Sequence, residues 1–136
     1  MESKTHQELC KRVWDRLANL KKTKGFIAFG QSNAFPLLNP PQPIFGHIPD
    51  LLIYNNNYKE LILGEAKTRT DIDNLHTLNQ LKSYLKYSKD FQKYSIYYEV
   101  QKVNVSHMRL LLYKARVYHE VSDFNNIYLN GTSFPY

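Results

Sequence analysis

Three ionisable residues near the middle of the chain, Asp50, Glu65 and Lys67, have types and spacing suited to phosphate chemistry. Successive side chains of a strand point to opposite faces, so Glu65 and Lys67 project together while Ala66 points away. Gly64 shares the side of Ala66, and the two leave a shallow surface on which a helix can pack closely. If residues 48–54 and 60–67 form a hairpin, Asp50 lies beside Glu65 at the far ends of the strands.

Hydrolysis of a phosphodiester gives each of these groups a use. Asp50 and Glu65 supply the hard oxygen ligands that hold Mg²⁺, whose other positions go to water and substrate phosphate. The backbone carbonyl of Ala66 is a further candidate ligand. A bound metal activates water and neutralises charge in the transition state, while Lys67 orients that water or stabilises the same charge. We predict a Mg²⁺ site in which Mn²⁺ substitutes.

This pattern resembles the PD-(D/E)XK nuclease superfamily, which includes restriction endonucleases, Holliday-junction resolvases and repair nucleases. Pro49-Asp50 precedes Glu65-Ala66-Lys67, residues 46–51 (GHIPDL) look like the G-x-P-D-L form of the VRR-NUC branch, and residues 80–84 (QLKSY) match the Q-x-x-x-Y pattern of some branches. The match covers about residues 5–100, and Ala66 departs from it where a β-branched residue is more usual. The resemblance implies a restriction-endonuclease-like core of order α-β-β-β-α-β.

The hydrophobic pattern predicts the elements that position these groups. Leu9, Val13 and Leu17 recur at helical spacing and predict a helix over residues 5–22, which a capping box formed by Thr5 and Glu8 would open. Further helices are predicted over residues 73–89 and 106–120. Strands are predicted at residues 26–29, 48–54, 60–67 and 94–100, with a short edge strand in the tail.

The order of these elements predicts one mixed α/β domain over residues 1–136, with a central mixed sheet flanked by helices. The nuclease core would occupy about residues 5–100, and a C-terminal helix and tail would occupy residues 101–136. Residues 36–46 hold four prolines, which remove amide donors and fix φ, so we expect an irregular connection there.

The predicted helix over residues 73–89 has two faces. Leucines line one face, and a second stripe of polar and aromatic side chains lies roughly opposite. The leucine stripe is sufficient to bury the helix against the core. The second stripe is therefore expected to face either solvent or a functional site. We predict that Gln80 hydrogen-bonds near Lys67 or the attacking water, and the alternative is a mixed exposed face. The residues of the second stripe are His76, Gln80, Tyr84 and Tyr87.

Glu8 has two interpretations. The resemblance implies a glutamate of the first helix near the metal, which makes Glu8 a provisional ligand. The capping box with Thr5 explains the same residue, and its direction lies away from the apolar stripe of that helix.

The charge balance favours a polyanionic partner. Eighteen Lys and Arg residues against twelve Asp and Glu residues leave a formal charge of +6 and a pI of about 9.3. Such a surface raises the local concentration of polyanions, although a solubilising lysine face has the same composition. The candidate DNA contacts are Arg69, Lys82, Tyr84 and Lys86.

Other classes of protein fit the composition less well. No apolar run approaches the roughly 20 residues that span a bilayer, and the N-terminal residues lack the apolar stretch of a signal peptide. Cys10 is the single cysteine, which excludes an internal disulfide. We therefore expect no membrane partner and a cytoplasmic location in a prokaryotic or phage-encoded setting.

The leading hypothesis is a Mg²⁺-dependent DNA endonuclease that is structure-selective or weakly sequence-specific, because few residues beyond the core are available to read bases. A site-specific restriction or homing endonuclease is the alternative within this class. The alternatives outside it are a non-catalytic DNA-binding module and a protein-interaction domain in which the motif is a coincidence. Because cleavage of two strands usually needs two sites, we expect a homodimer or a higher homo-oligomer.

Overall fold

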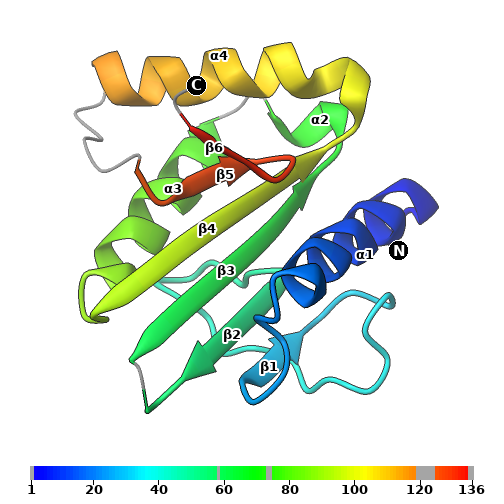
Figure 1. Cartoon of the computed structure of the whole chain (residues 1–136). Coiled ribbons are helices and arrows are strands. Elements are labelled where there is room, and N and C mark those ends of the chain that lie inside the picture. Colours follow the sequence, from blue (N-terminus) through cyan, green and yellow to red (C-terminus); the bar gives the residue numbers. More distant parts are fainter. Residues whose placement is uncertain (1, 58, 73–74, 119–124, 135–136) are drawn as a thin grey trace.

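A six-stranded mixed sheet, in the order β1-β2-β3-β4-β5-β6, runs through the centre of the molecule (Figure 1). The structure is a computed structural model, and it describes residues 2–57, 59–72, 75–118 and 125–134. The strands are β1 (Ile27–Gly30), β2 (Leu51–Asn55), β3 (Glu60–Lys67), β4 (Lys93–Val100), β5 (Ile127–Leu129) and β6 (Thr132–Phe134). The helices are α1 (Lys4–Asn19), α2 (Arg69–Ile72), α3 (Leu75–Ser88), a 3-10 turn (Lys102–Asn104) and α4 (Val105–Tyr118).

The sheet combines an antiparallel half with a parallel centre. Strands β1, β2 and β3 pair antiparallel, β4 pairs parallel with β3, and β5 pairs parallel with β4. The two parallel pairs are connected through α3 and α4, because parallel neighbours need a crossover. All eight residues of β3 are buried, as expected of a central strand covered on both faces.

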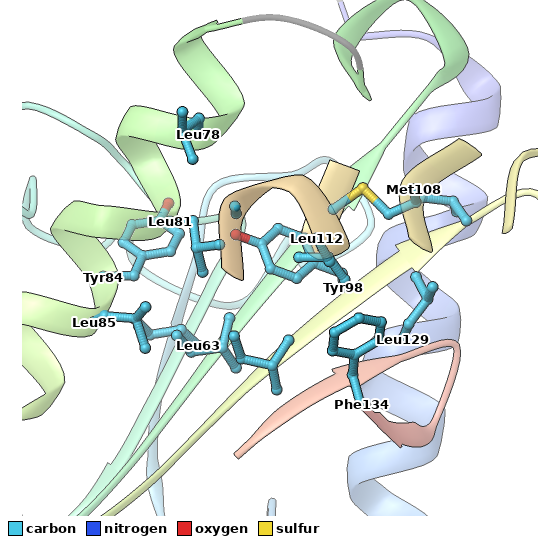
Figure 2. Packing of buried hydrophobic residues seen from close by; sticks show 14 of the residues in the cluster. Leu63, Leu78, Leu81, Tyr84, Leu85, Tyr98, Met108, Leu112, Leu129 and Phe134 are labelled. Carbon is cyan, nitrogen blue, oxygen red and sulfur yellow. The ribbon is translucent and has the colours of Figure 1, made fainter. Parts of the chain in front are cut away.

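Helices cover both faces of the sheet. The apolar stripe of α1 packs on one face, where Leu9 and Leu17 join Ile62 in a buried cluster. The leucines of α3 and the inner face of α4 pack on the other face, where Leu81 and Leu112 lie with Tyr98 (Figure 2). This second cluster is the larger one. It includes Leu63 of β3 and Tyr98 of β4, and Tyr98 pairs with Glu65 in the register of these two strands.

As predicted, a helix packs on the shallow surface of β3 at Gly64, and this helix is α1. A Cβ atom on Gly64 would lie 2.9 Å from Cγ1 of Val13 and 3.2 Å from Cβ of Leu51. Only a residue without a side chain allows α1 to approach β3 this closely. The glycine therefore sets the separation between α1 and the strand that carries Glu65.

The main elements confirm the sequence predictions, with shifts at their ends. The first helix begins at Lys4 and ends at Asn19, and the strand predicted at residues 48–54 begins at Leu51. The predicted capping box is wrong: the N-cap is Ser3, whose hydroxyl accepts a hydrogen bond from the backbone N–H of His6 over 3.1 Å. Of the predicted helices over residues 73–89 and 106–120, residues 73–74 and 119–120 lie outside the described part of the chain.

The C-terminal region differs more from the prediction. In place of one edge strand the tail forms a hairpin, with β5 paired on both sides and β6 at the sheet edge. Asn130 and Gly131 make the turn with φ of 48° and 83°, values that these two residue types tolerate. The short helix α2 was not predicted. Within the described residues, no helix has the length and apolar character needed to cross a membrane.

Candidate active site

Asp50 and Glu65 meet where β2 begins and β3 ends, as the predicted hairpin requires. The backbone N–H of Asp50 donates to Oε1 of Glu65 over 3.2 Å, and the backbone N–H of Ala66 donates to Oδ2 of Asp50 over 2.9 Å. Each carboxylate is therefore held by the main chain of the opposite strand. The two side chains are 6% and 4% exposed, so this pair of acids is almost completely removed from water.

Lys67 completes the predicted group of three. It projects from the same face of β3 as Glu65, and its Nζ lies 3.8 Å from Oε2 of that residue. Lys67 is also 5% exposed. Buried lysines are rare unless they are paired, because desolvation of the ammonium group costs on the order of several kcal/mol. The carboxylate of Glu65 provides that pairing.

The electrostatics of Glu65 reflect its crowded surroundings. Burial raises its pKa well above the usual value, and the neighbouring charge of Asp50 raises it further. Lys67 and the hydroxyl of Tyr84 act in the opposite direction and favour the carboxylate. The charge of Asp50 disfavours ionisation of Glu65, so a further positive charge beside the two carboxyl groups would favour the ionised pair.

Two of the four residues in the second stripe of α3 are buried, and one of them contacts Glu65. Tyr84 is fully buried, and its hydroxyl donates to Oε1 of Glu65 over 2.7 Å. Gln80, one turn earlier, is 4% exposed. Burial of both residues argues against the mixed exposed face at these positions. The prediction that Tyr84 contacts DNA is wrong, because a fully buried side chain cannot reach a phosphate at the surface.

Among the described residues, four buried polar side-chain atoms have no hydrogen-bond partner, and two of them belong to α3 and β4, the elements packed against β3. They are Oε1 of Gln80 and the hydroxyl of Tyr98, the residue that pairs with Glu65 in the register of β3 and β4. Burial raises the pKa of Tyr98, and the charge of Glu65 raises it further, so this hydroxyl keeps its proton. Unsatisfied buried polar groups are uncommon and often mark a functional site.

His6 belongs to the site although the sequence did not assign it a role. Its Nε2 lies 3.1 Å from Oδ2 of Asp50, and its Nδ1 lies 2.5 Å from Oε2 of Glu2. The hydrogen bond to Asp50 is the largest influence on the ring and raises the pKa of His6 to about 11. The imidazolium therefore balances the negative charge of Asp50. The i, i+4 spacing of Glu2 and His6 was the available signal in the sequence.

Glu8 does not take the place that was provisionally assigned to it. Its side chain is exposed, and His6 is the α1 residue that contacts Asp50. At 3.6 residues per turn, two residues along a helix rotate the side chain by about 200°. Because His6 faces Asp50, Glu8 faces away. The carboxylate that lies near the site from this part of the chain is that of Glu2, which precedes α1 and contacts His6.

Cys10 approaches the same imidazole from the next turn of α1. Ligand atoms of Glu2, His6 and Cys10 all lie within 4.8 Å of one another. The sulfur, however, is 3.8 Å from Nδ1 and 3.9 Å from Nε2 of His6. A sulfur nearly equidistant from both nitrogens lies against the ring instead of near one lone pair, so these three groups do not form a chelating set as they stand.

A hollow of about 630 Å³ opens over Asp50. The N-terminal end of α1, the loop at residues 31–33 and the region around Thr68 and Asp71 form its walls, and Glu2, His6 and Asp50 are among the lining residues. Glu65 and Lys67 are not among its lining residues. Of the three predicted site residues, Asp50 is therefore the one that borders the hollow.

The other predicted DNA contacts lie at the surface. Arg69 on α2 and Lys82 and Lys86 on α3 are exposed, as contacts with phosphate require. Lys86 also places its Nζ 4.8 Å from the centre of the Phe45 ring. His47 and His76 form a further feature that the sequence left unassigned, with ring centres 5.2 Å apart.

No family model, curated protein or solved structure matches this chain.

Proposed function

We propose that the chain is a divalent-metal-dependent nuclease that hydrolyses DNA phosphodiester bonds. The observation that carries the proposal is the convergence of Asp50, Glu65 and Lys67 from two strands at one buried place. Placing two buried carboxylates beside Lys67 and the partly buried His6 costs desolvation energy, which a purely structural role does not readily explain. A metal–phosphate site gives all three groups a use.

The fold is compatible with a restriction-endonuclease-like core of the PD-(D/E)XK type. Apart from the short helix α2 between β3 and α3, the order α1-β1-β2-β3-α3-β4 corresponds to the α-β-β-β-α-β order implied by the resemblance. Asp50 precedes β2 and the Glu65-Ala66-Lys67 segment ends β3, which are the places expected for these motifs. This agreement supports the assignment of residues 5–100 to a nuclease core.

The donor atoms fit Mg²⁺ or Mn²⁺. Asp50 and Glu65 supply hard carboxylate oxygens, and the carbonyl of Ala66 is a candidate third ligand. The raised pKa of Glu65, which results from burial and from the charge of Asp50, indicates a place where a cation would be favourable. When bound, the metal would lower the pKa of a water molecule and neutralise charge on the phosphate.

The remaining side chains have roles in orientation. Lys67 holds a fixed positive charge beside Glu65, where it can stabilise negative charge on the reacting phosphate. Gln80 offers an unpaired buried carbonyl oxygen, which can accept a hydrogen bond from the attacking water or from Lys67. His6 holds Asp50 in place from α1. Tyr84 holds Glu65 from α3.

The substrate class and assembly are part of the proposal. Few described residues lie outside the core elements, so a structure-selective or weakly sequence-specific endonuclease fits better than an enzyme that reads a long site. Cleavage of both strands of a duplex would use two copies of the site in a homodimer or a higher homo-oligomer. A monomer in sedimentation experiments, both with and without DNA, would contradict the assembly.

The test is cleavage by the purified chain with Mg²⁺ or Mn²⁺, using duplex, single-stranded, flap and four-way-junction DNA of matched sequence. We expect cleavage that EDTA stops. Asp50→Asn and Lys67→Ala should each lower the rate by about 10²- to 10³-fold while DNA binding is retained. Asp15→Asn and Lys11→Ala are matched controls, because both side chains are exposed on α1.

Cleavage at wild-type rate by both site variants would refute the assignment of the active site. DNA binding without hydrolysis under either metal would instead indicate a non-catalytic DNA-binding module. Absence of both DNA and Mn²⁺ binding would favour the protein-interaction domain.

A further inference from the structure

An apolar hollow of about 290 Å³ lies on the α3 face of the sheet, at the end opposite Asp50. Its floor is formed by Leu52 and Leu61, which are buried. Four aromatic side chains line it: Phe29 on β1, Tyr54 on β2, Tyr87 on α3 and Phe91 just after that helix. All four are only partly buried, so ring surface remains available to a ligand.

The aromatic rings are arranged as two walls. Phe29 and Tyr54 lie on the sheet with their planes parallel to within 3° and their centres 6.3 Å apart. Tyr87 and Phe91 are tilted by 58° with centres 5.5 Å apart. Flat aromatic side chains on a sheet are a common platform on which proteins stack unpaired bases. This arrangement suits a planar ligand.

The rim of the hollow adds polar recognition groups. The exposed amides of Gln42 and Asn56 line it, and each amide can both donate and accept hydrogen bonds. A nucleobase presents the same mixture of donors and acceptors at its edge. The volume falls just below the range of about 300–1,000 Å³ that holds drug-sized ligands, which is appropriate for one small ring system.

The charges around the hollow suit a ligand with a phosphate backbone. Lys86 and Lys89 are exposed on either side of Tyr87. Lys59 is exposed as well, and its carbonyl accepts the amides of Gln92 and Lys93 directly after Phe91. Asp90 is an exposed acid in the same turn. Among these exposed sequence neighbours of the lining residues, three lysines outnumber one acid, a balance that favours phosphates.

We propose that this hollow binds an unpaired base of single-stranded DNA. The inference rests on the proposed nuclease function and defines its substrate as DNA with a single-stranded segment near the cut. Leu61 precedes Glu65 by four residues on β3, which corresponds to about 13 Å along the strand.

The test measures binding without cleavage. Fluorescence anisotropy in EDTA compares a labelled single strand with a duplex of the same length, for the full chain and for Tyr87→Leu and Phe91→Leu. Leucine keeps the site apolar but removes the stacking surface. We expect each variant to bind the single strand about tenfold more weakly and the duplex as tightly as the wild type. Tyr113→Leu is the matched control, because this tyrosine is 51% exposed on α4.

Unchanged single-strand affinity in both variants would overturn the proposal, as would equal losses for single strand and duplex. Photocrosslinking of an iodouracil-containing strand gives a second measurement that uses the wild-type chain: crosslinks to Tyr87, Phe91 or Tyr54 support the hollow, and crosslinks confined to other residues overturn it. Single-strand binding that depends on Tyr87 without any cleavage would leave the hollow assigned and refute the nuclease. Cleavage at the wild-type rate by both variants would support the nuclease and overturn the assignment of the hollow.

Discussion

The hydroxyl of Tyr84 donates a hydrogen bond to Oε1 of Glu65 over 2.7 Å and so joins α3 to β3 inside the core. The same oxygen accepts the backbone N–H of Asp50 over 3.2 Å. Oε1 is therefore occupied by two protein donors, while Oε2 lies toward Lys67. This division fixes the orientation of the carboxylate before any ligand arrives.

Tyr84→Phe should weaken metal binding at the proposed site without removing the proposed ligands Asp50 and Glu65. Loss of the hydroxyl leaves Oε1 with one donor and lets the Glu65 side chain rotate. Partners of metal ligands typically contribute about 10- to 100-fold in affinity, so we expect the Mg²⁺ concentration for half-maximal cleavage to rise by about that factor. Tyr113→Phe, on the exposed side of α4, should leave it unchanged. Identical Mg²⁺ titrations for Tyr84→Phe and wild type would contradict this role.

His6 should make the stability of the fold depend on pH. Its pKa is about 11 in the folded chain against an ordinary value of 6.5, so the protonated ring contributes its full stabilisation below pH 6.5. That contribution is lost progressively as the pH rises toward 11. Urea unfolding of wild type and His6→Gln should give a difference in free energy of unfolding that shrinks over this range.

The exposed ring of His76 supplies a control for that measurement. His76→Gln should follow the wild-type profile from pH 6.5 upward. A constant difference between wild type and His6→Gln at all pH values would mean that the His6–Asp50 contact does not carry the effect.

Gly64→Ala should destabilise the fold by about 1–3 kcal/mol, the usual cost of overpacking. The added Cβ would lie 2.9 Å from Cγ1 of Val13, so α1 would have to move away from β3. Val13→Ala in the same chain should recover part of this loss, because it removes the clashing atom. A double-mutant cycle by urea denaturation measures the coupling, and strictly additive effects would show that the contact is not limiting.

Arg16→Met should cost about 3 kcal/mol, because it leaves Glu99 buried without its partner. Glu99 is 1% exposed, and the guanidinium of Arg16 binds both carboxylate oxygens over 2.8 and 3.0 Å. Arg16→Lys keeps the charge but not the paired geometry, so its loss should be intermediate. Arg12→Met at an exposed position of α1 should be nearly neutral. Equal stability of the Arg16→Met and Arg12→Met chains would argue against the pairing.

Arg69→Ala, Lys82→Ala and Lys86→Ala should each flatten the salt dependence of DNA binding. Each lost phosphate contact reduces the slope of log K against log salt by about 0.9. Lys114→Ala, on exposed α4, is the matched control for a change in net charge alone. The measurement is duplex affinity by anisotropy over a series of salt concentrations. Slopes that fall equally for all four variants would show that net charge, and not a defined surface, governs binding.

Residue patterns within single strands and helices were sufficient to predict which side chains share a face. Alternation along β3 placed Glu65 and Lys67 on one face and Gly64 with Ala66 on the other, and the structure has that arrangement. Helical spacing identified the buried stripe of α1. These features are predictable because side-chain direction follows directly from the local backbone period. The meeting of Asp50 with Glu65 needed one further assumption, that two adjacent strands pair as a hairpin.

The tertiary structure alone decided which distant groups complete the site. His6 contacts Asp50 across 44 positions of sequence, and Tyr84 reaches Glu65 from another helix. A periodic pattern indicates which face of a helix is buried, but it does not specify the partner on the other side. The apolar stripe of α1 packs on the sheet, and this orientation of the helix places His6 beside Asp50 and leaves Glu8 exposed. The sequence thus determined Asp50, Glu65 and Lys67 as a group, whereas helix packing on the sheet selected the residues that hold them.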